Sequence, residues 1–148
     1  MQTSHSNTVS VTPGFLIQLA TAILLLPINW VAAWLFAAVF HESCHYIVLR
    51  LYNVRVFSMR IGFSGAIIET EPMQPKQELL TALAGPFGGL VLLLLIRIFP
   101  RIAICALLQS LFNLLPIYPF DGGRALRASI SWLRAKTLSE KPLANKQK

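Results

Sequence analysis

The longest apolar stretch, from Phe15 to Leu51, constrains the fold more than any other feature of the sequence. It is too long for one straight membrane span, which needs about 20 apolar residues. Pro27 and Asn29 interrupt it, so we expect one helix over 11–27 and a second over 30–51, joined by a tight turn. One long kinked helix is the alternative, because membrane helices tolerate proline.

The composition agrees with a membrane protein. Of the 148 residues, 55% are hydrophobic and 13% are charged, about half the charged fraction of an ordinary soluble domain. Two further apolar stretches, 79–98 and 102–118, predict two more helices. We therefore expect an α-helical polytopic membrane protein with about four transmembrane helices, built as a single domain over 1–148. Residues 1–10 and 138–148 are polar and are expected to be disordered.

The segment between the second and third predicted spans has a different pattern. Short apolar groups at 54–56, 61–63 and 66–68 are spaced like strands, and Gly62 and Gly65 supply turn positions. This pattern predicts a β-hairpin over 54–68 at the membrane surface, with a plain loop as the alternative. Beyond Gly123, a basic amphipathic helix is expected over 124–137.

The chain carries 13 Lys and Arg residues against 6 Asp and Glu, a net charge of +7. These basic residues lie between and after the apolar stretches, a pattern typical of membrane-protein loops, so we expect no nucleic-acid partner. Most of them lie in the loop over 50–78 and after residue 123, whereas Arg97 and Arg101 lie in the loop between the last two spans. The positive-inside rule then places both termini in the cytoplasm.

The second predicted span contains the sequence His41-Glu42-Ser43-Cys44-His45. On a helix, residues four apart share a face, so both imidazoles can bind one metal ion. Zinc lowers the pKa of water to about 7, and a neighbouring carboxylate such as Glu42 can take up the proton without being a ligand. Ionisable groups inside a span are costly and are functional by default. The alternative is a pair of histidines that only pack between helices.

Two histidines leave zinc without a third protein ligand. Asp121 is the acidic residue at the end of an apolar stretch, inside the sequence Asn113-Leu-Leu-Pro-Ile-Tyr-Pro-Phe-Asp121-Gly-Gly. Prolines and glycines here would break the helix and let Asp121 turn towards the histidines. The alternative for Asp121 is an N-cap of the following basic helix.

Three motifs in this order resemble the site-2 proteases, which are intramembrane zinc metalloproteases. They are H-E-x-x-H at 41–45, Ala-Gly-Pro at 84–86, and N-x-x-P-x-x-P-x-D-G-G at 113–123. The resemblance covers about residues 30–127. The compact form of the last motif is most similar to the short bacterial branch that includes the sporulation pro-sigma-factor protease.

The resemblance implies one zinc ion per chain, bound by His41, His45 and Asp121. It implies that Glu42 is the general base and then the acid towards the leaving amine. Asn113 matches an asparagine that contacts substrate or stabilises the tetrahedral intermediate, and a helix–helix hydrogen bond is its alternative role. The hairpin matches a membrane-associated sheet whose edge can add a substrate strand.

The resulting hypothesis is a metalloprotease of regulated intramembrane proteolysis that cleaves a membrane-associated or transmembrane protein near the cytoplasmic face. Its expected surroundings are the lipid bilayer of a bacterial cell membrane and a regulatory membrane protein. A catalytically silent scaffold or binding relative of the same fold is the alternative, although zinc binding alone would not need Glu42. A zinc transporter is disfavoured, because few other polar residues lie in the apolar stretches.

Overall fold

The computed structural model describes residues 8–62 and 65–139. Two consecutive helices begin the apolar part of the chain, α1 over Pro13–Leu25 and α2 over Ile28–Leu51. Leu26 and Pro27 adopt extended backbone conformations between them. The predicted two-helix arrangement is therefore confirmed, and the single kinked helix is excluded.

The polar segment after α2 forms the predicted hairpin, with β2 over Val56–Gly62 and β3 over Gly65–Thr70. The two strands pair antiparallel, and a third strand, β1 over Thr8–Val11, pairs parallel with β2. The sheet order is β1-β2-β3, so among residues 8–62 and 65–139 one edge of β3 has no strand paired to it. On this sheet Glu69 accepts hydrogen bonds from Ser58 and Arg60, and these two neighbours hold the pKa of Glu69 below its usual value.

The strand β1 corrects the prediction of disorder for residues 8–10. Its alternating Thr-Val-Ser-Val sequence suits a strand, but its partner lies far along the chain and no turn connects the two. Residues 1–7 of that predicted segment lie outside the described residues. At the other end, the final helix continues through Ser139, so disorder is also wrong for 138–139, and 140–148 lie outside the described residues.

The second half of the chain is helical. Helix α3 covers Pro75–Val91 and continues as the 3-10 helix η1 over Leu92–Leu95. Helix α4 covers Pro100–Asn113, and α5 covers Asp121–Ser139. The predicted fourth helix, 102–118, therefore ends five residues early: Leu114 caps it, and the proline-containing loop 114–120 follows.

In the part of the chain that the structure describes, two helices are long and apolar enough to cross a membrane, Ile28–Leu51 and Pro75–Leu95. Helices α1 and α4 have 13 and 14 residues and fall short of the roughly 20 that a straight span needs. The structure is thus mostly helical with a small mixed sheet, and it supports two spans by length rather than four.

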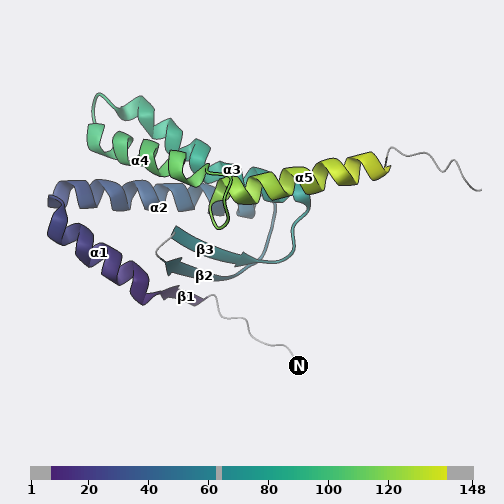
Figure 1. The fold of residues 1–148 in the computed structure, drawn as a ribbon, viewed down its shortest axis with the longest axis horizontal. Helices are drawn as coiled ribbons and strands as arrows, with labels where there is room; N and C mark the ends of the chain where they lie inside the picture. Colours follow the sequence, from purple (N-terminus) through teal and green to yellow (C-terminus); the bar gives the residue numbers. More distant parts are fainter. Residues whose placement is uncertain (1–7, 63–64, 140–148) are drawn as a thin grey trace, which may run out of the picture.

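Helix α2 lies between the sheet on one side and helices α3 and α4 on the other, and α1 lies on the side of the sheet (Figure 1). It packs against α3 and α4, and α5 packs against α3. The contacts are close because small residues face one another: Gly88 lies against Cys44 of α2, and Gly89 lies against Ser110 of α4. A buried cluster of Ala37, Leu92 and Ala106 joins α2, η1 and α4. This packing fixes the middle of α2 against the first turn of α5.

A candidate metal centre between α2 and α5

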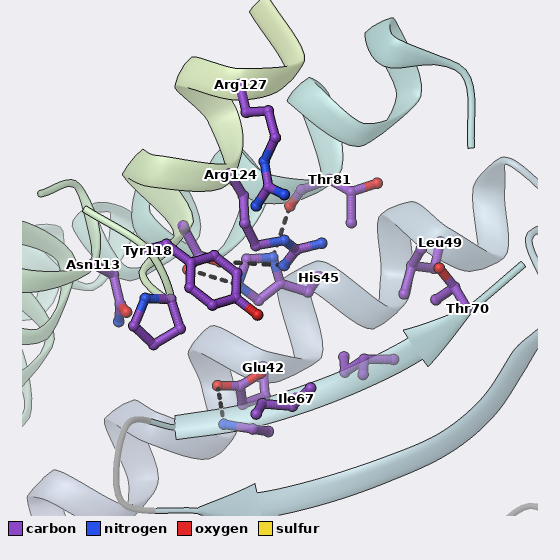
Figure 2. Close-up of a pocket in the computed structure, with 14 residues that line it drawn as sticks. Glu42, His45, Leu49, Ile67, Thr70, Thr81, Asn113, Tyr118, Arg124 and Arg127 are labelled. Carbon is purple, nitrogen blue, oxygen red and sulfur yellow. Dashed lines mark hydrogen bonds and ion pairs between the residues drawn. The ribbon is translucent and has the colours of Figure 1, made fainter. Parts of the chain in front are cut away.

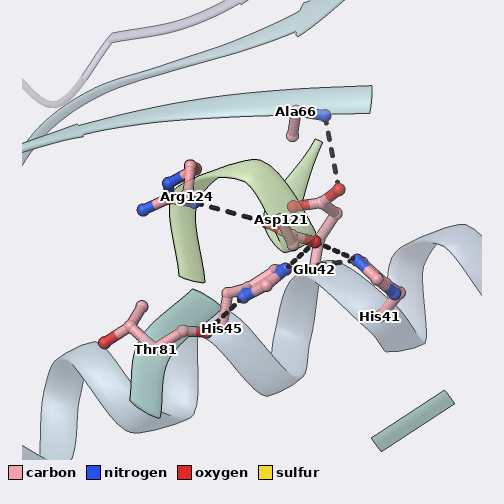
Figure 3. A network of polar contacts seen from close by, with 7 residues as sticks. All are labelled: His41, Glu42, His45, Ala66, Thr81, Asp121 and Arg124. Carbon is pink, nitrogen blue, oxygen red and sulfur yellow. Dashed lines mark hydrogen bonds and ion pairs between the residues drawn. The ribbon is translucent and has the colours of Figure 1, made fainter. Parts of the chain in front are cut away.

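The structure brings His41, His45 and Asp121 together (Figure 3). The histidines lie one turn apart on the buried face of α2, and Asp121 is the first residue of α5. Their exposed fractions are 2%, 4% and 7%. The Nε2 atoms of both histidines lie 3.0 and 3.1 Å from Oδ2 of Asp121, and 3.1 Å from each other. Three potential ligand atoms thus converge on one buried point.

The orientation of His45 indicates that this group can take a metal ion. Its Nδ1 lies 2.7 Å from the backbone oxygen of Thr81 and donates a hydrogen to it. In a neutral imidazole, Nε2 then carries a lone pair, which points at the other two ligand atoms. Tetrahedral zinc holds its nitrogen and oxygen ligands roughly 3.3 Å apart, close to the observed spacing. The donor set and its hydrogen-bonded backbone carbonyl therefore fit zinc.

Asp121 reaches the histidines because the chain before it folds back tightly. A Cβ atom on Gly122 would overlap the backbone of Leu114, and one on Gly123 would lie 2.6 Å from the carbonyl carbon of Ile117. Only glycine fits at these two positions, which explains the Gly-Gly pair. The carboxylate of Asp121 contacts the two histidines and, at 3.5 Å, Arg124. This arrangement favours the predicted ligand over the alternative of an N-cap.

Gly85 of α3 closes the other side of the group. A Cβ atom at this position would overlap Nε2 of His45 and lie 2.6 Å from Nε2 of His41. Gly85 is itself buried, as is Pro86 beside it. The absence of a side chain at Gly85 therefore leaves room at the ligand atoms, and this gives the Ala-Gly-Pro motif a physical role that the sequence alone did not reveal.

Glu42 lies beside the histidines but faces the sheet. Its Oε1 accepts a hydrogen bond of 3.3 Å from the backbone N–H of Ala66, near the start of β3. Gly65, directly before Ala66, has a φ of +108°, a conformation that other residues rarely adopt. The hairpin therefore meets α2 at the acidic residue of the H-E-x-x-H motif.

A cavity of about 250 Å³ lies between α2, β3, the end of α4 and the start of α5 (Figure 2). Glu42, His45 and Asp121 line it on one side, and Ala66, Ile67, Ile68 and Thr70 of β3 line it on another. Asn113, the last residue of α4, is also on its wall, so every predicted site residue except the more deeply placed His41 lines this cavity.

Sequence reasoning missed several residues of the cavity wall, namely Thr81, Tyr118, Arg124 and Arg127. Arg124 and Arg127 are three residues apart on α5, so they share a face of that helix. Helical spacing could have paired them with each other, but only the packing of α5 against α3 shows that they line this cavity.

Comparison with known proteins agrees with this geometry. Residues 92–146 match the model of peptidase family M50. Over 123 residues the chain is 31% identical to a zinc metalloprotease of Methanocaldococcus jannaschii, covering 74% of this chain and 36% of that protein. The solved site-2 protease of the same organism matches 84% of this chain and 68% of its own, with a TM-score of 0.65 and 25% identity.

The chain belongs to the site-2 protease family. It is also 35% identical over 113 residues to the Rip3 protein of Mycobacterium tuberculosis, covering 64% of this chain and 28% of Rip3. The chain thus spans about a third of the length of the curated relatives it matches. Site-2 proteases are membrane-embedded, which agrees with the two long apolar helices.

Proposed function

We propose that this member of the site-2 protease family is an intramembrane zinc endopeptidase. The observation that carries the proposal is the convergence of His41, His45 and Asp121 beside Glu42, in a cavity bordered by an unpaired strand edge. A metal group, a carboxylate and a surface for an extended peptide are the parts that peptide hydrolysis requires.

One zinc ion would be held by His41, His45 and Asp121. When bound, it supplies a Lewis acid that polarises the scissile carbonyl and makes water more acidic. The hydrogen bond from His45 to the carbonyl of Thr81 orients that imidazole. The position of Asp121 at the N-terminus of α5 favours its negative charge.

Glu42 is the proposed general base. Its carboxylate takes a proton from the attacking water and then gives it to the leaving amine. The N–H of Ala66 donates a hydrogen bond to one carboxylate oxygen and holds the Glu42 side chain near the start of β3. Zinc binding has no need of this carboxylate, so its presence favours a catalyst over the silent scaffold considered from the sequence.

The unpaired edge of β3 is the proposed substrate surface. Ala66 directs its N–H at Glu42 and therefore away from β2. In an antiparallel pair the direction alternates, so the N–H and C=O of Ile68 also point away from β2, and Ile68 lines the cavity. A substrate segment that unwinds into a strand can pair there, with its backbone next to Glu42.

Asn113 is proposed to contact the substrate or to stabilise the tetrahedral intermediate. Its place on the cavity wall supports this role. Its position at the end of α4, directly before the loop that carries the chain to Asp121, makes it part of the same broken-helix segment.

The proposed substrate is a membrane-associated or transmembrane protein cleaved near the cytoplasmic face, with both termini of the chain in the cytoplasm of a bacterial cell. The distribution of Lys and Arg supports this orientation. Control by a regulatory membrane protein, and a place in the sporulation branch, remain proposals that rest on the resemblance of the motifs.

The test compares wild type with Glu42→Gln and Asp121→Ala, purified in detergent, for zinc content and for cleavage of a co-expressed panel of membrane-tethered proteins. We expect about one zinc in wild type and in Glu42→Gln, cleavage by wild type alone, and reduced zinc in Asp121→Ala.

Equal zinc loss in both variants would contradict the assignment of roles. Zinc in wild type without cleavage of any substrate would favour the silent relative. An absence of zinc in wild type, after metal loss has been controlled, would return the histidines to a packing role.

A further inference from the structure

Two arginines face the proposed catalytic cavity from α5. Arg124 and Arg127 both line it, and Figure 2 shows their side chains directed from α5 towards His45. Neither residue is needed to hold a metal ion, and Arg127 plays no part in the mechanism above. Two like charges on one helix face repel each other, so their placement at a shared cavity calls for an explanation.

The acidic groups nearby do not balance these two charges. The Oδ2 atom of Asp121 is directed at the two imidazoles, and only its Oδ1 contacts Arg124, at 3.5 Å. Within 8–62 and 65–139, no acidic residue forms an ion pair with Arg127. Glu42 bonds instead to Ala66. A bound divalent cation would add to the positive charge of the cavity.

Tyr118 holds Arg127 in place without neutralising it. The guanidinium carbon of Arg127 lies 5.4 Å from the centre of the Tyr118 ring, a cation–π contact. This contact restricts a long side chain and leaves its N–H donors available. A planar guanidinium held in this way is suited to bind a carboxylate through two parallel hydrogen bonds.

We propose that Arg127, with Arg124 beside it, forms a subsite for an acidic side chain of the substrate. The inference rests on the proposed protease function and names one specificity determinant of it. A peptide is favoured over an anionic lipid headgroup because the arginines line the same cavity as Glu42 and the unpaired edge of β3. A peptide strand on β3 would therefore pass the arginines as it passes the catalytic carboxylate.

The test uses one membrane-tethered model substrate whose cytoplasmic juxtamembrane residues are replaced singly by Asp, Asn or Lys. Cleavage is measured in liposomes of zwitterionic lipid and, in parallel, in liposomes with increasing shares of anionic lipid. We expect one position at which Asp gives a kcat/KM on the order of ten-fold above Asn, as a charge-assisted hydrogen bond in a partly exposed site would give. Arg127→Gln should abolish this preference, and Arg127→Glu should shift it towards Lys.

Arg134→Glu is the matched control, because Arg134 lies on the exposed part of the same helix and does not line the cavity. It makes the same change of charge and should keep the preference for Asp. Tyr118→Leu should weaken the preference, since it releases Arg127. Melting temperatures of all variants separate loss of the subsite from loss of the fold.

Binding of the Asp and Asn versions of the substrate to the Glu42→Gln protein, with and without Arg127→Gln, distinguishes a wrong subsite from a wrong function. If wild type cleaves no version of the substrate, the protease proposal fails, but tighter binding of the Asp version that requires Arg127 would still support the subsite. Equal binding and equal cleavage of the Asp and Asn versions would overturn it. A rate that follows the anionic lipid content of the liposomes, and not the charge of the peptide, would assign the arginines to headgroups and would overturn it as well.

Discussion

At the scale of single residues, the proposed metal site depends on the lack of a side chain at Gly85. Gly85 brings the backbone of α3 so close to His41 and His45 that any Cβ would occupy the space next to their Nε2 atoms. Nearby, Thr81 of the same helix accepts the hydrogen bond from His45. Helix α3 therefore sets both the room around the ligand atoms and the orientation of one imidazole.

Gly85→Ala is expected to weaken zinc binding. The added methyl group must displace α3 or rotate the imidazoles, and disturbed support of metal ligands typically lowers affinity about 10- to 100-fold. The measurement is zinc per chain at controlled free zinc, together with the melting temperature.

Gly88→Ala is the control for this variant, because Gly88 lies at the same α2–α3 interface but faces Cys44. It should lower stability and still bind zinc. Wild-type zinc affinity in Gly85→Ala would show that the close approach has no bearing on the metal.

The roles of individual residues were predictable to different extents. His41, Glu42 and His45 followed from helical spacing, and Asp121 followed from its place in a proline- and glycine-rich frame. The structure brings His41, His45 and Asp121 together, whereas the chemical roles of all four residues stay predictions. The contacts of Gly85 and Arg127 could not be predicted, because they depend on how α3 and α5 pack rather than on any local pattern.

At the scale of elements, the hairpin was predictable and the complete sheet was not. Alternating residues and glycines indicate β2 and β3, whereas β1 has four residues and a parallel partner distant in sequence. Helix α4 ends at Asn113, before the predicted position, because Pro116 and the residue before it disfavour continuation of an α-helix. The sheet order leaves the β3 edge open towards the cavity.

Ile68→Pro tests the use of that edge. The N–H of Ile68 points away from β2, so proline at this position should leave the hairpin paired and remove a donor for the substrate strand. We expect a melting temperature near that of wild type, retained zinc, and at least a several-fold loss of kcat/KM on a membrane-tethered substrate.

Ile67→Pro should behave in the opposite way, because Ile67 pairs with Arg60 of β2 and directs its backbone groups into the ladder. This variant should destabilise the sheet itself. Full activity of Ile68→Pro would argue that substrates do not pair with this edge at Ile68.

At the scale of the whole molecule, the proposed zinc ion would join two distant parts of the chain. It would link the middle of α2 to the start of α5, and both of these helices pack against α3. A ligand that binds only the folded state stabilises it by about 2.7 kcal/mol when its concentration is a hundred times Kd. Metal removal should therefore affect stability as well as activity.

A strong chelator is expected to abolish cleavage and lower the melting temperature, while the protein stays in the membrane because its apolar helices do not depend on the metal. Added zinc should restore both properties. Glu42→Gln should show the same change in melting temperature although it is inactive. Identical melting with and without zinc would mean that the metal does not link α2 to α5.

The separation of the site residues along the chain also matters during synthesis. Asp121 lies 80 positions after His41, and it is held by a helix whose Ala125 and Ala128 are buried. A ribosome makes Glu42 and both histidines long before it reaches that helix. A nascent or truncated chain can therefore enter the bilayer with its H-E-x-x-H helix in place and still lack the third proposed zinc ligand.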